Sequence, residues 1–515
     1  MKILIRSHHT DREVPIFPGD TVFDAILRSG QALDAYCGGN GSCGKCKVYW
    51  VQGAKEVLAC KLPAQDGMMI ETTSSNGMQI LEASVEKELQ INPVVQAEGT
   101  SFGVAVDLGT TTIVGYLLNL QSGKELAIRS MANPQRIYGA DVISRIAYTQ
   151  RETKGVEKLQ EVLIAALNQL IMELCQAASV EREEILAMTI AANTVILHTL
   201  LGVSAASIAA APFEPVFTEA KKLTSRSLGL GISKQGKVFL LPSVSGYVGA
   251  DIIGGLLVCD LEQRENYSLL LDIGTNGEIV LGNRHQMLAC STAAGPAFEG
   301  ANISSGLAGV CGAIASFRLQ DGVRRSETVG GMAPLGICGS GLIDIVAELL
   351  THDFVDSTGA FRQADLLEPW QREMLTTVDN QPAFVVVPLG SGQKEILFTQ
   401  RDLREVQLAK GAVRAGLLTL LREAQIGCEE IETLYVAGGF GNFVDVQSAC
   451  KVGLIPPELG TRVIRIGNGS GFGAKLCLLD QEQLVRGTKL KEMIRYIELS
   501  SRLDFQDFFM ESMLF

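Results

Sequence analysis

The first eighty residues alternate short apolar and polar stretches, which predicts a small domain rich in β-strands. Residues 2–6 and 14–17 have the two-residue period of strands on either side of a short turn. Residues 22–28 follow a polar capping residue and precede a glycine, which predicts a helix. Two further strands are expected over residues 46–51 and 68–72.

Two longer apolar segments later in the chain are each interrupted by a turn rich in glycine. Residues 102–117 have the sequence FGVAVDLGTTTIVGYL, and residues 269–281 have the sequence LLLDIGTNGEIVL. In both, an apolar strand ends near an aspartate, Asp107 or Asp272, and a second apolar strand follows the turn. A repeated Asp-x-Gly-Thr hairpin indicates an internal duplication. We therefore expect two similar lobes that face each other across a cleft, with two ordinary hairpins as the alternative interpretation.

The polar segment before the first hairpin marks a domain boundary. Residues 83–100 contain a proline and several charged residues, and they lead into a new apolar strand. A chain of 515 residues is too long for a single core. We expect an N-terminal domain at residues 1–82, a linker at 83–100, and two lobes at 101–262 and 263–515.

Composition and charge argue against several classes of partner. The net charge is −13 and no long run of lysine or arginine occurs, which disfavours nucleic acid. No uninterrupted apolar run reaches the roughly 18 residues needed to cross a bilayer, and the N-terminus lacks the apolar region of a signal peptide. The sequence therefore predicts a cytoplasmic protein without nucleic-acid or membrane partners.

Four of the twelve cysteines form a distinct pattern: Cys37, Cys43, Cys46 and Cys60. Three lie in one glycine-rich loop, CGGNGSCGKC, and the fourth follows a predicted strand. This spacing is typical of iron–sulfur ligation, because glycines let the backbone curl so that its amides reach the cluster sulfurs. The first gap is one residue longer than the plant-type spacing, and the gap before Cys60 is short. A structural zinc site is the alternative interpretation, and a disulfide framework is disfavoured because the chain shows no secretory context.

The two hairpins and two further glycine-rich turns carry the candidate nucleotide chemistry. Asp107 and Asp272 end strands, where a carboxylate can hold Mg²⁺ through water and position an attacking water. The hairpin turns offer backbone amides and hydroxyls to phosphate oxygens. A glycine pair after the strand at 434–437 suits the close approach of a base or ribose, and a glycine-rich turn opens a helix over 342–350. The candidate nucleotide contacts are Gly109, Thr110, Thr111, Thr112, Gly274, Thr275, Asn276, Gly277, Glu278, Glu299, Gly339, Ser340, Gly341, Gly438 and Gly439.

Some of these candidates have structural alternatives. Glu278 can be a second acidic partner in the site or one member of a salt bridge at a strand end. The turn at residues 339–341 can serve tight packing at the start of a helix instead of a nucleotide. His198 has no cysteine or aspartate next to it in the sequence, so we expect a core histidine.

This set of motifs resembles the superfamily of ATPases that includes acetate and sugar kinases, heat-shock chaperones and actin (the ASKHA proteins). The resemblance covers residues 102–515, with the two hairpins as phosphate motifs and residues 436–441 as the adenosine motif. It implies an actin-like, RNase H-like fold in each lobe, with ATP and Mg²⁺ in the cleft. The N-terminal pattern resembles β-grasp 2Fe–2S ferredoxins, which implies a 2Fe–2S cluster on the four cysteines. The expected fold class is thus a multidomain α+β and α/β protein.

The fusion of such a ferredoxin with such an ATPase resembles the reductive activators of corrinoid proteins. The resemblance implies ATP-dependent transfer of one electron from the 2Fe–2S cluster to inactive Co(II), which restores Co(I) for methyl transfer. The implied partners are a corrinoid protein of a methyltransferase system and an upstream low-potential electron donor, with a homodimer as one alternative for the oligomeric state. One departure is AANTV at residues 191–195, where a Gly-Asn-Thr-Thr turn would be expected. Other stretches that share the resemblance are residues 133–135, 138–145, 193–198, 246–251, 294–300, 399–402, 407–410, 496–500 and 508–510.

Three other functions stay open at this point. An ASKHA-type small-molecule kinase would leave the ferredoxin unexplained. An ATP-dependent activator of another low-potential metalloenzyme, such as a dehydratase, typically holds its cluster between two subunits. A ferredoxin scaffold with an inactive ATPase is disfavoured by the intact Asp107 and Asp272.

Overall fold

The computed structural model of the chain describes residues 1–6, 11–29, 33, 46–72, 91–96, 99–390, 395–441 and 443–515. By packing, the chain forms two compact units. Unit 1 comprises residues 1–76 and 95–240, and unit 2 comprises residues 77–94 and 241–515.

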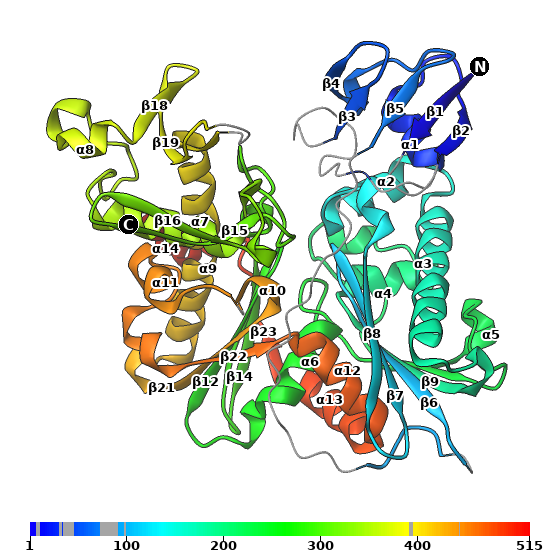
Figure 1. Cartoon of the computed structure of the whole chain (residues 1–515). Helices are drawn as coiled ribbons and strands as arrows, with labels where there is room; N and C mark the ends of the chain where they lie inside the picture. Colours follow the sequence, from blue (N-terminus) through cyan, green and yellow to red (C-terminus); the bar gives the residue numbers. More distant parts are fainter. Residues whose placement is uncertain are drawn as a thin grey trace. The chain divides into compact units, whose positions relative to one another are not determined.

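The first domain of unit 1 is a five-stranded sheet with one helix packed on it (Figure 1, blue). Ile3, Ile5, Ile26 and Ile70 belong to its fully buried core. The strand order is β2-β1-β5-β3-β4 with β1 and β5 parallel, so the predicted β-grasp is confirmed. Strand β4 is an addition that the hydrophobic pattern does not predict. The elements are β1 (Lys2–Arg6), β2 (Asp11–Pro15), α1 (Val22–Ser29), β3 (Lys47–Trp50), β4 (Lys55–Leu58) and β5 (Met69–Glu71).

The second domain of unit 1 is built on a six-stranded sheet with the order β10-β11-β9-β6-β7-β8. Strands β6, β7 and β8 form an antiparallel meander, β9 lies parallel to β6, and β11 lies parallel to β9. Gly115 on β7 leaves room for Leu170 and Leu174 of helix α3. The strands are β6 (Phe102–Leu108), β7 (Thr112–Asn119), β8 (Glu125–Ala132), β9 (Ile185–Ala192), β10 (Lys221–Thr224) and β11 (Lys237–Leu240), and the helices are α2 (Val142–Arg151), α3 (Gly155–Ala178), α4 (Thr194–Leu200) and α5 (Ser225–Leu228).

Unit 2 is built on a six-stranded sheet with the order β22-β21-β12-β13-β14-β23 and on two three-stranded sheets, β16-β15-β17 and β18-β19-β20. The strands of the large sheet are β12 (Tyr267–Ile273), β13 (Gly277–Gly282), β14 (Met287–Thr292), β21 (Ile431–Ala437), β22 (Val463–Gly467) and β23 (Ile494–Tyr496). The small sheets contain β15 (Ala313–Gln320), β16 (Val323–Thr328), β17 (Gly336–Ile337), β18 (Leu375–Val378), β19 (Gln381–Val387) and β20 (Ile396–Thr399). The helices are α6 (Ala250–Cys259), α7 (Gly339–Thr351), α8 (Pro369–Arg372), α9 (Gln400–Ala424), α10 (Gly438–Gly441), α11 (Val446–Val452), α12 (Gly469–Leu479), α13 (Gln481–Met493) and α14 (Leu503–Ser512).

The two large sheets share one topology. The run β8-β7-β6-β9-β11 in unit 1 corresponds to the run β14-β13-β12-β21-β22 in unit 2. In each run, an antiparallel meander of three strands is extended by two further strands. These two lie parallel to the meander strand that comes first in the chain, β6 in unit 1 and β12 in unit 2. This is the RNase H-like arrangement, and it confirms the internal duplication predicted from the two hairpins.

Helix α6 packs against α12 at glycines of both helices. A Cβ atom on Gly473 of α12 would lie 2.2 Å from the Cα of Gly254 on α6, so the two backbones are nearly in contact. The end of the linker is attached to the same part of unit 2, because the Asn92 amide donates to the carbonyl of Leu479 at 2.8 Å. Residues 241–262, which we expected in the first lobe, therefore pack within unit 2.

Helix α3 is, within the described ranges, the one helix that is long and apolar enough to span a membrane by length and composition. Core helices of soluble proteins pass the same test. Leu163, Leu167, Leu170 and Leu174 of α3 are fully buried in unit 1. The apolar surface of α3 is thus explained by its packing on the sheet.

Candidate functional site

Two of the four candidate cluster ligands lie in the described part of the chain, and their thiols converge. The Sγ atoms of Cys46 and Cys60 are 3.2 Å apart. This separation is longer than the about 2.05 Å of a disulfide bond. Cys46 is 1% exposed, whereas Cys60 is half-buried. Cys37 and Cys43 lie outside the described residues.

The hairpin β3–β4 explains why a short gap between these cysteines suffices. Lys47 at the start of β3 pairs with Leu58 at the end of β4. The next residue, Ala59, donates its amide to the carbonyl of Cys46 at 2.8 Å. The chain therefore returns directly to Cys46, and Cys60 follows in the next position. Two convergent thiols on a rigid hairpin fit half of a four-cysteine cluster site.

The turn of the first Asp-x-Gly-Thr hairpin is hydrogen-bonded to Asn133, which directly follows β8. The Asn133 side chain donates to the carbonyl of Gly109, and its backbone amide donates to the carbonyl of Thr111, each at 2.8 Å. The Gly109 amide donates to the Thr112 carbonyl at 3.0 Å, and a Cβ on Gly109 would lie 2.6 Å from that oxygen. Across a trans peptide the next N–H points opposite to the carbonyl, so the Thr110 amide, which follows the Gly109 carbonyl, faces the other side of the turn. The Thr111 amide does the same, because the Thr110 carbonyl that precedes it accepts from Arg145. This orientation suits an anion.

Arg145 and Asn193 fix Thr110 in this turn. Arg145 is 2% exposed and donates to the carbonyls of Thr110 and Gly139 and to the side chain of Gln135. The Asn193 amide donates to the Thr110 hydroxyl at 2.8 Å. The turn is thus supported by residues distant in sequence, which is a device for pre-organising a binding loop.

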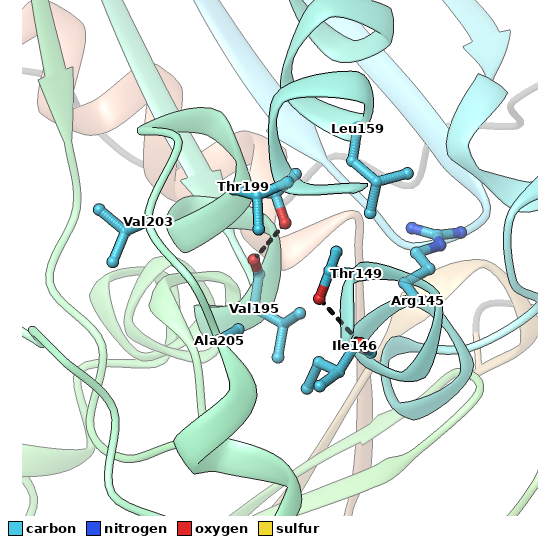
Figure 2. Close-up of a pocket in the computed structure, with 9 residues that line it drawn as sticks. Arg145, Ile146, Thr149, Leu159, Val195, Thr199, Val203 and Ala205 are labelled. Atoms are coloured by element: carbon cyan, nitrogen blue, oxygen red, sulfur yellow. Dashed lines mark hydrogen bonds between the residues drawn. The ribbon is translucent and has the colours of Figure 1, made fainter. Parts of the chain in front are cut away.

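A cavity of about 10 Å³, roughly the space of one water, lies beside Arg145. Figure 2 shows the residues that line it. The hydroxyls of Thr149 and Thr199, which line it, donate to carbonyls one turn earlier on their own helices, those of Ile146 and Val195. The cavity is therefore a small gap in the packing of α2, α3 and α4 and is too small for a nucleotide.

The second hairpin places its aspartate in an equivalent position. Asp107 lies beside Ala191 of β9, and Asp272 lies beside Ala437 of β21, in each case on the parallel neighbour of the first hairpin strand. Both aspartates are partly exposed. Asp272 also faces Glu278 across the hairpin.

Glu278 belongs to a group of carboxylates in unit 2. Burial raises the pKa of Glu278 well above its ordinary value, and the charges of Asp251 and Asp272 raise it further. A fraction of the residue still reaches the surface, so the shift reflects an enclosed acidic environment rather than a dry core. Glu278 therefore tends to retain a proton next to Asp272, which argues against a salt bridge at the strand end.

The turn of the second hairpin is tied to the segment after β14. The Thr275 hydroxyl donates to the carboxylate of Glu299 at 2.8 Å. The Gly274 amide donates to the carbonyl of Asn276 at 2.9 Å and closes the turn. A Cβ on Gly277 would lie 2.7 Å from the Thr292 hydroxyl, so packing alone requires this glycine. The structure thus brings Glu299 to the second hairpin, and its contact with a nucleotide stays a prediction.

The two glycines of the adenosine motif have different surroundings. Gly438 has a φ of +86°, and a Cβ there would lie 2.7 Å from Oδ1 of Asp272. Gly439 is exposed, and a Cβ there would meet no atom within 4 Å. Gly438 is therefore required by the fit of β21 against the hairpin, whereas Gly439 borders open space that a ligand could use.

The glycine-rich start of α7 is packed tightly. A Cβ on Gly339 would lie 2.0 Å from the Phe298 carbonyl, and one on Gly341 would lie 2.2 Å from the Ile314 carbonyl. The buried Ser340 donates its hydroxyl to the carbonyl of Ala315 at 2.8 Å. Packing accounts for these residue types, and their contact with a nucleotide stays a prediction.

Asn133, Arg145 and Asn193 are the supporting residues that reasoning from the hairpins alone does not find. All three lie in stretches that resemble the corrinoid activators, and that resemblance is the one signal that marks them. His198 lies in the same stretch as Asn193 and is a core residue, as expected: its Nδ1 contacts the Thr194 carbonyl at 2.7 Å, and its Nε2 accepts from the Val216 amide at 3.0 Å.

Comparisons with known proteins cover the whole length of the chain. A model of a 2Fe–2S iron–sulfur cluster binding domain matches residues 8–75, the RACo middle region matches 102–264, and the C-terminal ASKHA domain of RACo matches 266–515. The corrinoid activation enzyme RamQ of Eubacterium limosum is 31% identical, with 98% of each chain covered. The chain belongs to the family of reductive activators of corrinoid proteins.

Further relatives agree with this assignment. A solved structure of a reductive activator for corrinoid, iron–sulfur protein has a TM-score of 0.76 and 27% identity, and covers 100% of this chain and 98% of its own. The Co(II) methylated amine-specific corrinoid protein reductase of Methanosarcina barkeri is 24% identical over 74% of this chain and 71% of that protein. The match over residues 8–75 favours a 2Fe–2S cluster over the zinc alternative. The middle-region model extends through α6, although α6 packs within unit 2.

Proposed function

We propose that this protein reductively activates a corrinoid protein in a reaction driven by ATP hydrolysis. It passes one electron from a 2Fe–2S cluster to inactive Co(II) and so restores Co(I) for methyl transfer. One observation carries the proposal: a single chain, similar to RamQ over its whole length, combines two converging thiols with two Asp-x-Gly-Thr hairpins. Its relatives are named a corrinoid activation enzyme and a Co(II) corrinoid protein reductase.

The proposed ligands of the cluster are Cys37, Cys43, Cys46 and Cys60. When bound, the cluster supplies a single electron at low potential. Cys46 would hold the inner side of the cluster, because it is buried immediately before β3. Cys60 is half-buried and marks the side from which a partner can approach.

The two hairpins are the proposed phosphate-binding elements for ATP. In the first hairpin, the carbonyls of Gly109 and Thr110 accept hydrogen bonds from supporting residues. The amides of Thr110 and Thr111 therefore point the other way, where they can donate to a phosphate oxygen. Asp107 and Asp272 are proposed to position Mg²⁺ and the attacking water. Within the described residues no group of three or more His, Cys, Asp or Glu side chains is placed to hold a metal ion. Mg²⁺ would be shared with the phosphates of the nucleotide, as is usual for this ion.

The need for ATP follows from the expected potentials. Plant-type 2Fe–2S clusters have potentials near about −400 mV, and the Co(II)/Co(I) couple is expected to lie lower. Each 100 mV of uphill transfer costs about 2.3 kcal/mol per electron. ATP hydrolysis supplies this free energy. Whether ATP or ADP is bound to the protein would control its docking on the corrinoid protein.

The test is anaerobic mixing of the reduced full-length protein with a Co(II) corrinoid protein, with and without Mg-ATP, followed by visible absorption. We expect the Co(I) spectrum to appear only in the mixture that contains Mg-ATP. Formation of Co(I) at the same rate without ATP would overturn the coupling. Stimulation of ATP hydrolysis by sugars or small acids, and not by the corrinoid protein, would favour a kinase.

Asp107→Asn and Asp272→Asn separate hydrolysis from folding. Each change keeps the size of the side chain and removes its charge, so we expect intact folding, an intact cluster spectrum and loss of ATP hydrolysis. Full hydrolysis in either variant would remove that aspartate from the mechanism. We also propose a cytoplasmic location, with reduction by an upstream low-potential donor.

A further inference from the structure

The side chain of Asn193 makes two hydrogen bonds with opposite ends of its amide. Its Oδ1 accepts from the backbone amide of Ile196 at 2.9 Å, which caps the start of α4. Its Nδ2 donates to the hydroxyl of Thr110 at 2.8 Å. The cap determines which end of the amide is oxygen, because only an oxygen can accept from the Ile196 N–H. The nitrogen therefore faces Thr110.

This contact determines the direction of the Thr110 hydroxyl. A hydroxyl has one hydrogen to donate and two lone pairs. One lone pair of Thr110 receives the Asn193 N–H, so the hydroxyl hydrogen must point away from Asn193. Among the described residues, none accepts a hydrogen bond from this hydroxyl. The Thr110 side chain is partly exposed and can thus donate to an outside oxygen.

The second hairpin has the opposite polarity. There the Thr275 hydroxyl donates to the carboxylate of Glu299, so its hydrogen is already engaged and its lone pairs face outward. An ionised carboxylate only accepts hydrogen bonds, whereas an amide nitrogen only donates them. The duplicated hairpins therefore present different groups at equivalent threonines: a donor at Thr110 and acceptors at Thr275.

We propose that Asn193 is a positioning residue for ATP hydrolysis, which holds the Thr110 hydroxyl as a hydrogen-bond donor to a phosphate oxygen of the nucleotide. This inference rests on the proposed function, because it requires ATP at the first hairpin. Arg145 supports the backbone of the same residue, since it donates to the Thr110 carbonyl. The counterpart residue Glu299 leaves the Thr275 hydroxyl as an acceptor, which suits water or a cation, so phosphate at the second hairpin would be bound by backbone amides rather than by this hydroxyl.

Asn193→Asp is the informative variant. Aspartate caps a helix about as well as asparagine, so α4 keeps its cap. The new carboxylate has no N–H to donate and would instead accept the Thr110 hydroxyl, as Glu299 does with Thr275. Asn193→Ser, which also caps but lacks the amide nitrogen, is the second variant if the added charge prevents folding.

Asn168→Asp is the matched control in unit 1. Its side chain also has two roles, because it donates to the Gly229 carbonyl at 2.9 Å and accepts from the Gly231 amide at 2.6 Å. It lies on α3, away from the hairpin turn. We expect it to change ATP hydrolysis little, whatever it does to stability.

The experiment measures kcat and KM for ATP, the melting temperature and the cluster absorption of each variant. A hydrogen bond to a charged group typically contributes about 1.5–3 kcal/mol, so Asn193→Asp should lower kcat/KM about 10- to 150-fold with a nearly unchanged melting temperature. Thr110→Val should cause a similar loss, and the double variant should be no worse than either single one. Wild-type-like kcat/KM in a folded Asn193→Asp or Asn193→Ser protein would overturn the inference. So would fully additive losses in the double variant.

A failure of the proposed function would give a different result in the same assays. In that case the wild-type protein itself neither binds nor hydrolyses ATP, and the variants cannot differ from it. An active wild-type protein with unaffected Asn193 variants refutes the role of Asn193 alone.

Discussion

Replacement of Gly438 by alanine tests how the end of β21 fits against the hairpin of unit 2. Gly438 has a φ of +86°, and an added Cβ would lie 2.7 Å from Oδ1 of Asp272 and 2.9 Å from the carbonyl oxygen of Ile273. Backbone strain of this kind costs about 1–3 kcal/mol. The overlap adds to that cost unless Asp272 moves. We therefore expect Gly438→Ala to destabilise unit 2 by about 2–3 kcal/mol and to reduce ATP hydrolysis, since Asp272 is displaced.

The assay uses the distribution of tryptophans. The chain has two, Trp50 in the N-terminal domain and Trp370 in unit 2. In a Trp50→Phe background, urea unfolding followed by fluorescence reports on unit 2 alone. The expected result is a lower midpoint with an unchanged slope, which indicates a loss of stability rather than a change in the unfolding surface.

Gly439→Ala is the matched control. A Cβ on Gly439 meets nothing within 4 Å, and the residue lies in the short helix α10. Its stability change should stay within about 0.5 kcal/mol. An unchanged midpoint in Gly438→Ala, or an equal loss in both variants, would refute the reasoning. Weaker ATP binding in Gly439→Ala at full stability would support its proposed contact with the nucleotide.

Three further predictions concern the cluster and two titrating groups. Cys60→Ala should abolish the visible absorption of the 2Fe–2S cluster in anaerobically purified protein, and Cys428→Ala should retain it; equal spectra would contradict the ligand assignment. Because the pKa of Glu278 is raised by burial, its contribution to the stability of unit 2 is full below pH 4.5 and is lost as pH rises through the raised pKa. Glu278→Gln should flatten this pH dependence in urea titrations, and an unaltered profile would count against it. Burial lowers the pKa of His198 below 6.5, so the stability of unit 1 should be full above pH 6.5 and fall as acid protonates the ring and breaks the bond from Val216. His198→Gln should weaken that acid loss in thermal scans, and a slope as steep as that of the wild type would refute it.

Much of the fold could be predicted because its signals are local. The alternation over residues 2–6 and the paired apolar runs on either side of Asp107 and Asp272 predict strands that the structure contains. The repeat of one hairpin motif predicts the shared topology of the two large sheets. Strand β4 was not predicted, because its two polar residues, Lys55 and Glu56, precede its two apolar ones and give no alternation.

For the candidate site, the sequence indicated the cysteines whose thiols converge, but it did not indicate the residues that support the first hairpin. Cysteine spacing indicates Cys46 and Cys60 as partners, and their thiols converge. Gly339, Gly341 and Gly438 look like nucleotide contacts in the sequence, yet close packing requires them in the structure. A glycine is required both where a ligand approaches the backbone and where a carbonyl oxygen packs against it. The sequence alone therefore could not separate these two causes.

By itself the sequence determined the candidate groups for chemistry in this protein: four cysteines proposed to hold a cluster and two turns proposed to bind phosphates, each encoded within a short segment. Only the tertiary structure decided the polarity of the two threonine hydroxyls, a donor at Thr110 and acceptors at Thr275. Thr110 is oriented by Asn193, 83 positions away, and Thr275 by Glu299, 24 positions away. The direction of a hydroxyl depends on its hydrogen-bond partner in space, and folding alone brings such partners together.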